Sequence, residues 1–436
     1  MLNLLLTSLL LGSPTGGVFA GPTHANGSTI YWAPAVLGRL PPQTAVMAEF
    51  VGYVTHVTYQ RAAEDPATQP GYPEVSFTSP TPDLSVTFLF NIDALESRGI
   101  RLYAGGFSPS GGGTRWPKDG PQRYGGTFGN YITYGAMGGL IWTPHPRVSF
   151  AAGGGPLYLN VKLENAYDFG AFINSKLTPG ADLFALEDPA LEGYLKLGMD
   201  GWTVMGQLSA DVMVLDNLEL AVGFFIAKTP TVDGNVEVQG PAALRDALPN
   251  LVVNPRGRIL LPYPLPWFVS AEAKLTLGKW QIAPLLQFQR RSRQRVLVAR
   301  VVESESDFIE GDQVSLRESR DEWVMGMRIA RQLSDTLTLA VRGDVIPRNT
   351  PKEAINPVGL DFTLIEGNVG ARILTGERTA LELTASGVYG IPVNVERSIF
   401  NPRADPSSGL ASSSPIGRYS ALGAKIMIAF SARLGD

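Results

Sequence analysis

The chain has few residues of the types that carry out acid–base or nucleophilic chemistry. Its 436 residues include three histidines, His24, His56 and His145, and no cysteine. His145 stands between two prolines in a short turn, and no Gly-x-Ser-x-Gly nucleophile motif is present. His56, with serines nearby, is the one histidine that could form a Ser–His pair. We therefore expect no enzyme activity, no metal site and no cofactor.

Charged side chains are the other candidates for contact with a ligand, and several of them stand on the polar sides of segments that alternate between polar and apolar residues. They are Glu219, Glu272, Lys274, Arg328, Arg342, Asp344 and Glu382. Because both signs occur together, we expect mutual pairing across an enclosed interior and not a single-sign ion filter. Lys274 or Arg342 could alternatively bind a substrate carboxylate, whereas ion pairs that brace the fold are the other interpretation of each.

The clearest alternation runs from Asp200 to Ile226. Apolar residues occupy one side of each limb, and polar residues such as Gln207 and Asp211 occupy the other, with a tight turn at Asp216-Asn217. This pattern predicts an antiparallel hairpin. Each limb has at least the roughly 9–11 residues that a tilted strand needs to cross a bilayer.

About fourteen such segments follow one another along the chain. They lie near 44–60, 82–93, 99–109, 130–143, 147–163, 199–214, 217–228, 260–277, 279–300, 322–333, 336–346, 359–374, 378–389 and 418–433. Short turns alternate with long loops, which is typical of a barrel inserted from the periplasm. The sequence therefore predicts an all-β protein, a transmembrane antiparallel β-barrel of about fourteen strands in the bacterial outer membrane.

The composition agrees with a membrane barrel and excludes other classes. Hydrophobic residues make up 44% and charged residues 17%, below the roughly 25% of an ordinary soluble domain. The formal net charge of −4 gives no reason to expect a nucleic-acid partner. No apolar run is long enough for a spanning helix, since the longest, Leu4 to Leu11, is short and interrupted.

The N-terminal part divides into two expected regions ahead of the barrel, which we place at 44–436 with long extracellular loops. Residues 1–20 have the apolar run and the small-residue cleavage site of a secretory signal peptide, although Met1-Leu2-Asn3 lacks a basic residue. Residues 21–43 are apolar and rich in glycine and proline. Because a fourteen-stranded barrel is too wide to be filled by its own side chains, we expect 21–43 to be a plug inside the lumen.

Two stretches carry a family resemblance. Residues 27–38, which include Trp32, Ala33, Pro34 and Ala35, resemble the N-terminal plug of the FadL/TodX family of outer-membrane transporters for long-chain fatty acids and aromatic hydrocarbons. In that family an Asn-Pro-Ala tripeptide closes the plug, and Ala33 replaces the asparagine here. Residues 99–109 resemble the kinked third strand, and 124–126 and 161–163 follow at a similar spacing.

The resemblance implies passive uptake of hydrophobic small molecules. A ligand caught by the extracellular loops would reach a lumenal pocket and leave sideways, where the third strand bends inward beside the plug. The residues implied at this gate are Gly105, Gly106, Phe107, Ser108 and Pro109. Glycines permit a bend and proline cannot donate to the ladder. Alternatively, the glycines relieve crowding and Pro109 ends the strand.

Other interpretations remain open. The runner-up function is a general diffusion porin or a structural barrel without a specific ligand, which would have a continuous wall and a polar water path. The basic run Arg290 to Arg295 could bind the phosphates of lipopolysaccharide or be solvated in a loop. Outer-membrane lipid is the expected surrounding, and we expect a monomer.

Overall fold

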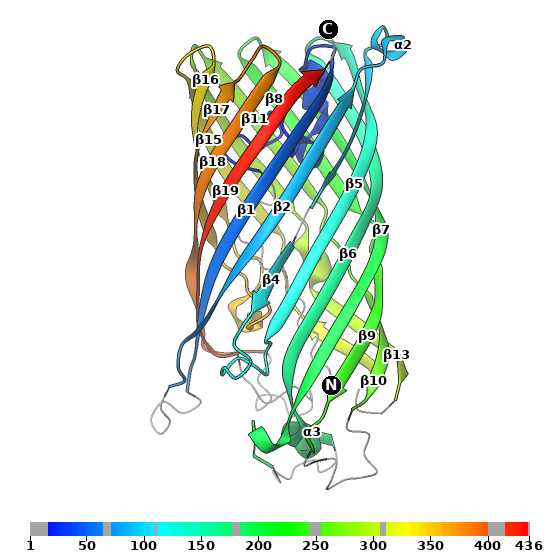
Figure 1. Ribbon diagram of the computed structural model, residues 1–436, viewed down its shortest axis with the longest axis vertical. Coiled ribbons are helices and arrows are strands. Elements are labelled where there is room, and N and C mark those ends of the chain that lie inside the picture. Colours follow the sequence, from blue (N-terminus) through cyan, green and yellow to red (C-terminus); the bar gives the residue numbers. More distant parts are fainter. Residues whose placement is uncertain are drawn as a thin grey trace.

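The protein is a closed antiparallel β-barrel of fourteen wall strands, seen here in a computed structural model (Figure 1). The structure describes residues 16–434 except 64–70, 109–110, 177–183, 186, 243, 245–253, 306–310 and 400–414. β1 and β19 close the wall by pairing along the whole of Thr44–Arg61 and Gly417–Leu434. Closure matters because an unpaired strand edge is costly in lipid. The predicted fold class is confirmed.

The wall is built from nineteen strand segments. They are β1 (Thr44–Arg61), β2 (Val75–Phe90), β3 (Ile100–Phe107), β4 (Gly111–Arg115), β5 (Phe128–His145), β6 (Val148–Asp168), β7 (Glu192–Leu215), β8 (Leu218–Ala227), β9 (Thr231–Gln239), β10 (Arg256–Pro262), β11 (Phe268–Leu277), β12 (Trp280–Gln289), β13 (Val296–Ser304), β14 (Gly311–Leu316), β15 (Glu322–Gln332), β16 (Leu337–Ile346), β17 (Leu364–Leu374), β18 (Thr379–Val395) and β19 (Gly417–Leu434).

Five wall strands are interrupted, so that each consists of two segments. The third is β3 with β4, and the seventh to tenth are β8 with β9, β10 with β11, β12 with β13, and β14 with β15. In the sequence, prolines stand at three of these breaks: Pro109 after β3, Pro230 after β8 and Pro264 after β10. The sequence predicted uninterrupted strands over 260–277 and 279–300, and the structure corrects both.

Side-chain alternation explains which face of each strand meets lipid. On the hairpin of β7 and β8, Trp202 and Leu208 are exposed on the outside, whereas Gln207 and Asp211 are buried inside. The tight turn falls at Asp216-Asn217, as predicted. Apolar residues therefore face the bilayer and the polar set lines the lumen.

Short turns and long connections are sorted to opposite ends of the barrel. In Figure 1 the short turns lie at the upper end with the C-terminus, and the longer connections lie at the lower end. Several strands extend further into the long connections than expected. β2 begins at Val75, ahead of the strand expected at 82–93. β4 lies between the strands expected at 99–109 and 130–143, and β9 lies between those expected at 217–228 and 260–277.

The first described residues, 16–43, fold inside the upper part of the barrel (Figure 1). They contain α1 (Thr29–Trp32) and the 3-10 helix η1 (Pro34–Arg39), and most of their residues are buried. We call residues 16–43 the N-terminal segment. The remaining short helices connect strands: α2 (Asp93–Glu96), α3 (Phe169–Lys176), η2 (Pro189–Leu191), η3 (Arg291–Gln294) and η4 (Lys352–Ala354).

No described helix combines the length and the hydrophobicity needed to span a membrane.

Candidate functional site

Basic side chains of the wall hold the N-terminal segment by its backbone carbonyls. Arg328 Nη1 donates to Phe19 O at 3.1 Å, and Lys425 Nζ donates to Gly16 O at 3.1 Å. Arg342 Nη1 donates to Ala20 O, and Lys274 Nζ reaches Thr23 O at 3.3 Å. These contacts link β11, β15, β16 and β19 to one segment, which fixes it across the lumen.

Acidic side chains complete the same network. Glu272 accepts from Thr23 N at 2.8 Å and from Thr23 Oγ1 at 2.6 Å, and Glu382 lies 2.7 Å from His24 Nε2. Asp344 pairs with Arg342, and Glu366 pairs with Lys425. The mixed-sign lumenal charges predicted from the sequence therefore lie together and are paired.

Arg342 and Lys274 differ in the exposed fraction of their side chains. The Arg342 side chain is 2% exposed and engaged by Asp344 and Ala20, whereas the Lys274 side chain is 22% exposed and pairs with Glu219. Contact of either with a substrate carboxylate stays a prediction. Their present partners all belong to this chain.

The end of the N-terminal segment packs closely on β7 and β8. Gln207 Nε2 donates to Tyr31 O at 2.8 Å, and Ala35 N donates to Ser209 Oγ at 3.0 Å. A Cβ at Gly223 would stand 1.8 Å from Trp32 O, so only glycine permits this approach. Ala33 has no polar side chain, and the wall amide of Gln207 supplies a bridge between segment and wall.

Aromatic rings join the N-terminal segment to the end of β3. Tyr31 lies 4.8 Å from Phe268 and 5.9 Å from Phe107, measured between ring centroids. Phe225 stacks on Phe268 at 4.9 Å. Such pairs contribute roughly 0.5–1.5 kcal/mol each beyond burial. Tyr31 of the N-terminal segment thus packs against Phe107, the last residue before the interruption of the third wall strand.

The third wall strand contains one extra residue at its interruption. Phe107 pairs with Gly135 of β5, and Gly111 pairs with Ile132, so four residues of the third strand advance against three of β5. The register against β5 therefore shifts by one residue between β3 and β4, and such a shift bends a strand. Ser108 Oγ donates to Thr133 O at 2.8 Å. Pro109, the last predicted gate residue, lies outside the described residues.

The ladder between β2 and the third wall strand is open over part of its length. Val86–Phe90 pair with Leu102–Gly106, but the described residues show no pairing of Val75–Ser85 with β4, although β4 runs alongside (Figure 1). On its other side, β2 pairs with β1 without a break from Val75 to Leu89. The interior-facing Ser79, Thr81 and Asp83 of this stretch are only half-buried.

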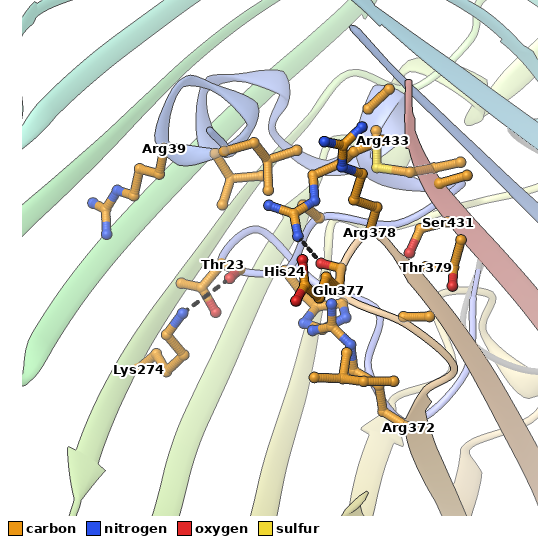
Figure 2. Close-up of a pocket in the computed structure, with 18 of the residues that line it drawn as sticks. Thr23, His24, Arg39, Lys274, Arg372, Glu377, Arg378, Thr379, Ser431 and Arg433 are labelled. Atoms are coloured by element: carbon orange, nitrogen blue, oxygen red, sulfur yellow. Dashed lines mark hydrogen bonds between the residues drawn. The ribbon is translucent and has the colours of Figure 1, made fainter. Parts of the chain in front are cut away.

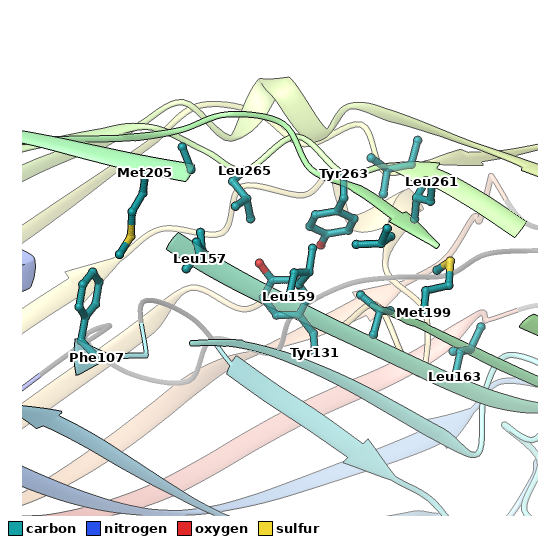
Figure 3. Close-up of a cluster of buried hydrophobic side chains, with 14 of the residues drawn as sticks. Phe107, Tyr131, Leu157, Leu159, Leu163, Met199, Met205, Leu261, Tyr263 and Leu265 are labelled. Carbon is teal, nitrogen blue, oxygen red and sulfur yellow. The ribbon is translucent and has the colours of Figure 1, made fainter. Parts of the chain in front are cut away.

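A large apolar cluster faces the lumen next to this opening (Figure 3). It runs from Phe107 at the end of β3 across the inner side of β6 and β7 to the interruption between β10 and β11. Its members in the figure include Phe107, Tyr131, Leu157, Leu159, Leu163, Met199, Met205, Leu261, Tyr263 and Leu265. An apolar inner face is unusual for a porin, whose lumen is polar.

One cation lies at the edge of the apolar cluster with hydrogen-bonding capacity left over. Arg317 is 4% exposed, and its Nη1 donates to Tyr263 Oη at 3.2 Å. Its Nε and Nη2 have no hydrogen-bond partner among the described residues. The sequence offered no signal for Arg317, because it stands at a break between β14 and β15 and outside any alternating strand.

The basic run Arg290 to Arg295 spans the break between β12 and β13 and is largely engaged within the chain. Arg291 Nε lies 2.8 Å from Glu322, and Arg293 Nη1 donates to Leu265 O at 3.0 Å. Asp361 lies in the connection between β16 and β17. Burial and the negative charge of Glu322 raise the pKa of Asp361 to about 6. Binding of lipopolysaccharide by the basic run stays a prediction.

A cavity of about 360 Å³ lies at the short-turn end against the N-terminal segment (Figure 2). Lys274, Arg372 and Arg433 come to it from β11, β17 and β19, and His24 contributes from the segment. Among the described residues, no group of three or more His, Cys, Asp or Glu side chains could hold a metal ion.

Comparisons with known proteins show which solved structures share this fold. No protein-family model matches the chain, and no curated protein matches it. A FadL homologue of Pseudomonas aeruginosa has a similar structure, with a TM-score of 0.78 and 12% identity over 99% of this chain and 98% of that chain. The toluene transporter TodX of Pseudomonas putida has a TM-score of 0.68 and 14% identity, covering 99% of this chain and 100% of its own. The toluene transporter TbuX of Ralstonia pickettii has a TM-score of 0.63 and 12% identity over 97% and 96%. The predicted resemblance is thereby confirmed for the fold.

Proposed function

We propose that this chain, which has the fold of the FadL and TodX barrels, takes up hydrophobic small molecules by passive diffusion across the bacterial outer membrane. It works as a monomer surrounded by outer-membrane lipid, with the short turns in the periplasm. A ligand enters at the long-loop end, reaches the apolar cluster in the lumen, and leaves sideways between β2 and the third wall strand.

The observation that carries this proposal is the position of the apolar cluster. Phe107 belongs both to the cluster and to the end of β3, where the wall ladder opens. The N-terminal segment, buried and hydrogen-bonded to the wall, obstructs the direct path toward the short turns. A hydrophobic molecule on the cluster therefore has a shorter way into lipid than into the periplasm.

Arg317 narrows the substrate class. A guanidinium presents its donors in a planar fork that matches a carboxylate, and a buried one without an acidic partner is costly to keep. Nε and Nη2 of Arg317 are free of hydrogen bonds among the described residues, and they lie beside an apolar surface. We propose that the substrate carries an acidic head on a hydrophobic body, as a long-chain fatty acid does, in preference to a plain aromatic hydrocarbon.

Binding of laurate and of toluene to the purified protein tests this choice. In the variant Arg317→Gln, we expect laurate to bind about tenfold more weakly, which corresponds to about 1.4 kcal/mol. Toluene binding should be unchanged, because toluene has no charge to pair. Thermal stability should not fall, since this guanidinium has no acidic partner among the described residues to leave behind.

Arg328→Gln is the matched control, because Arg328 is equally buried but is engaged by Glu272 and Phe19 O. It should lower the unfolding temperature and leave the affinity for laurate near the wild-type value. Equal laurate binding by wild type and Arg317→Gln would refute the acidic-head proposal. No binding of either ligand to the wild type would refute hydrophobic uptake itself.

A further inference from the structure

Among the described residues, β2 is a continuous strand that is paired on only one side over its first half. Its pairing with β1 runs without a register shift from Val75 to Leu89, but its pairing with β3 begins only at Val86. Two prolines, Pro80 and Pro82, lie in the half that is paired with β1 alone. Proline has no backbone N–H. Within a strand it is therefore tolerated only where the N–H of that residue would not take part in the ladder.

Val86, further along β2, shows to which side Pro80 and Pro82 would direct a backbone N–H if they had one. The carbonyl oxygen of Val86 points toward the third wall strand, because it lies 2.0 Å from the position of a Cβ on Gly105. Backbone polar groups of alternate residues in a strand point to the same side. Residues 84, 82 and 80 therefore also direct their backbone toward the third wall strand. The two prolines remove two donors from the open edge and none from the ladder with β1.

Between residues 80 and 84, the backbone N–H of Leu84 is thus the one donor that remains on this edge. In lipid, each unsatisfied N–H would be costly, and it would favour pairing with any strand within reach.

Two other prolines within wall strands, Pro284 and Pro156, follow the same rule. Pro284 of β12 pairs with Met327 of β15, but the ladder toward β11 is absent between Leu285 and Ile282. Pro156 of β6 pairs with Val204, and the ladder toward β5 is absent between Leu157 and Gly154. Each of these strands therefore turns its missing donor toward a gap in the ladder. At Pro80 and Pro82 the gap extends to the end of the strand.

We propose that Pro80 and Pro82 are the residues that hold the lateral opening permanently open, by making the edge of β2 unable to pair with the third wall strand. This inference rests on the proposed function. It gives the two prolines a positioning role, because a bend in the third wall strand does not by itself prevent β2 from pairing with that strand. The opening is then a fixed window bounded by β2 and β4, lined inside by Ser79, Thr81 and Asp83. A hydrophobic ligand passes it without breaking hydrogen bonds.

The double substitution Pro80→Val and Pro82→Val tests the inference, since valine suits both a strand and the lipid-facing side where these prolines lie. The two new amides can pair with the third wall strand and close the window. In proteoliposomes we expect the initial rate of laurate uptake to fall about thirtyfold, the factor that two ordinary backbone hydrogen bonds supply. Laurate binding to the protein in detergent should be unchanged, and hydrogen exchange should show both new amides protected.

Pro284→Val is the matched control, because Pro284 is also exposed on the outer face of a wall strand but lies where the wall continues on both sides. It should leave uptake unchanged. A double variant with wild-type uptake, or with uptake and binding reduced equally, overturns the inference. If the wild type itself shows no uptake, the proposed function fails, and hydrogen exchange still decides whether the edge pairs.

Leu84→Pro provides an independent test if the double variant does not fold. It removes the donor that remains between residues 80 and 84, so we expect a folded barrel with the heat-dependent gel migration of the wild type and uptake no lower than the wild-type rate. Failure of Leu84→Pro to fold would mean that this edge is paired, and would overturn the inference.

Discussion

At the residue scale, Gly105 and Gly106 are adjacent but meet very different surroundings. A Cβ on Gly105 would lie 2.0 Å from Val86 O and 2.8 Å from Ile30 Cδ1, whereas the nearest atom to a Cβ on Gly106 would be Gly135 O at 3.6 Å. Gly105 therefore permits both the pairing of β3 with β2 and the seating of the N-terminal segment.

Substitution of each glycine by alanine separates the two positions. Gly105→Ala must displace β2 or Ile30, and we expect it to destabilise the barrel by about 1–3 kcal/mol, as overpacking does. Gly106→Ala should change stability by less than about 0.5 kcal/mol. Thermal unfolding in detergent measures both. Equal unfolding temperatures for the two variants would contradict the assignment of Gly105 as the crowded position.

Sequence reasoning could place single residues on a face of the wall but could not pair them across the lumen. Alternation alone put Lys274 and Arg342 on the inner side. Their carbonyl partners, Thr23 and Ala20, are more than 200 residues away in the chain, and no local pattern encodes such a contact. Pro80 and Pro82 could not be recognised for another reason. The strand expected at 82–93 begins at Pro82, whereas β2 begins at Val75, so both prolines belong to a strand that is paired on one side only.

At the scale of elements, strands were predictable where the two faces differ in polarity, and less so where they do not. The turn between β7 and β8 and the whole of β8 were located to within a residue or so, because lipid and lumen impose opposite demands on successive side chains, whereas β7 begins at Glu192, ahead of the expected 199. Interruptions such as the one between β12 and β13 were not foreseen. Arg290 to Arg295 interrupts the strand with a 3-10 turn (η3), and a short turn of polar residues leaves the alternation on both sides intact.

The N-terminal segment gives a prediction about processing. Cleavage after Ala20, as expected from the sequence, would remove Gly16 and Phe19, whose carbonyls accept hydrogen bonds from Lys425 and Arg328. Val18 and Phe19 are also buried. Because loss of these contacts would leave buried cations with fewer partners, we expect the mature protein to retain residues 16–20. The intact mass of protein purified from outer membranes measures this; a mature chain that begins at Gly21 would contradict it.

At the scale of the whole molecule, the barrel and its contents depend on each other. Fourteen strands enclose more space than their own side chains fill, and the remaining space at the short-turn end is taken by the N-terminal segment. Lumenal charges such as Arg328, Arg342 and Lys425 are buried because this segment covers them. The wall strands, in contrast, pair with one another and do not need the segment for their ladders.

Removal of residues 16–43 should therefore leave a barrel but change what passes through it. Water would enter the emptied end and hydrate the exposed charges, so that no buried ion is left unpaired. We expect the truncated protein to insert into planar bilayers and to conduct ions, whereas the complete protein should be nearly silent, because its N-terminal segment blocks the axial path. Conductance is also where a general porin differs from a hydrophobic channel. A porin would conduct with its full chain, and a large steady conductance of the complete protein would favour that function over sideways exit into lipid.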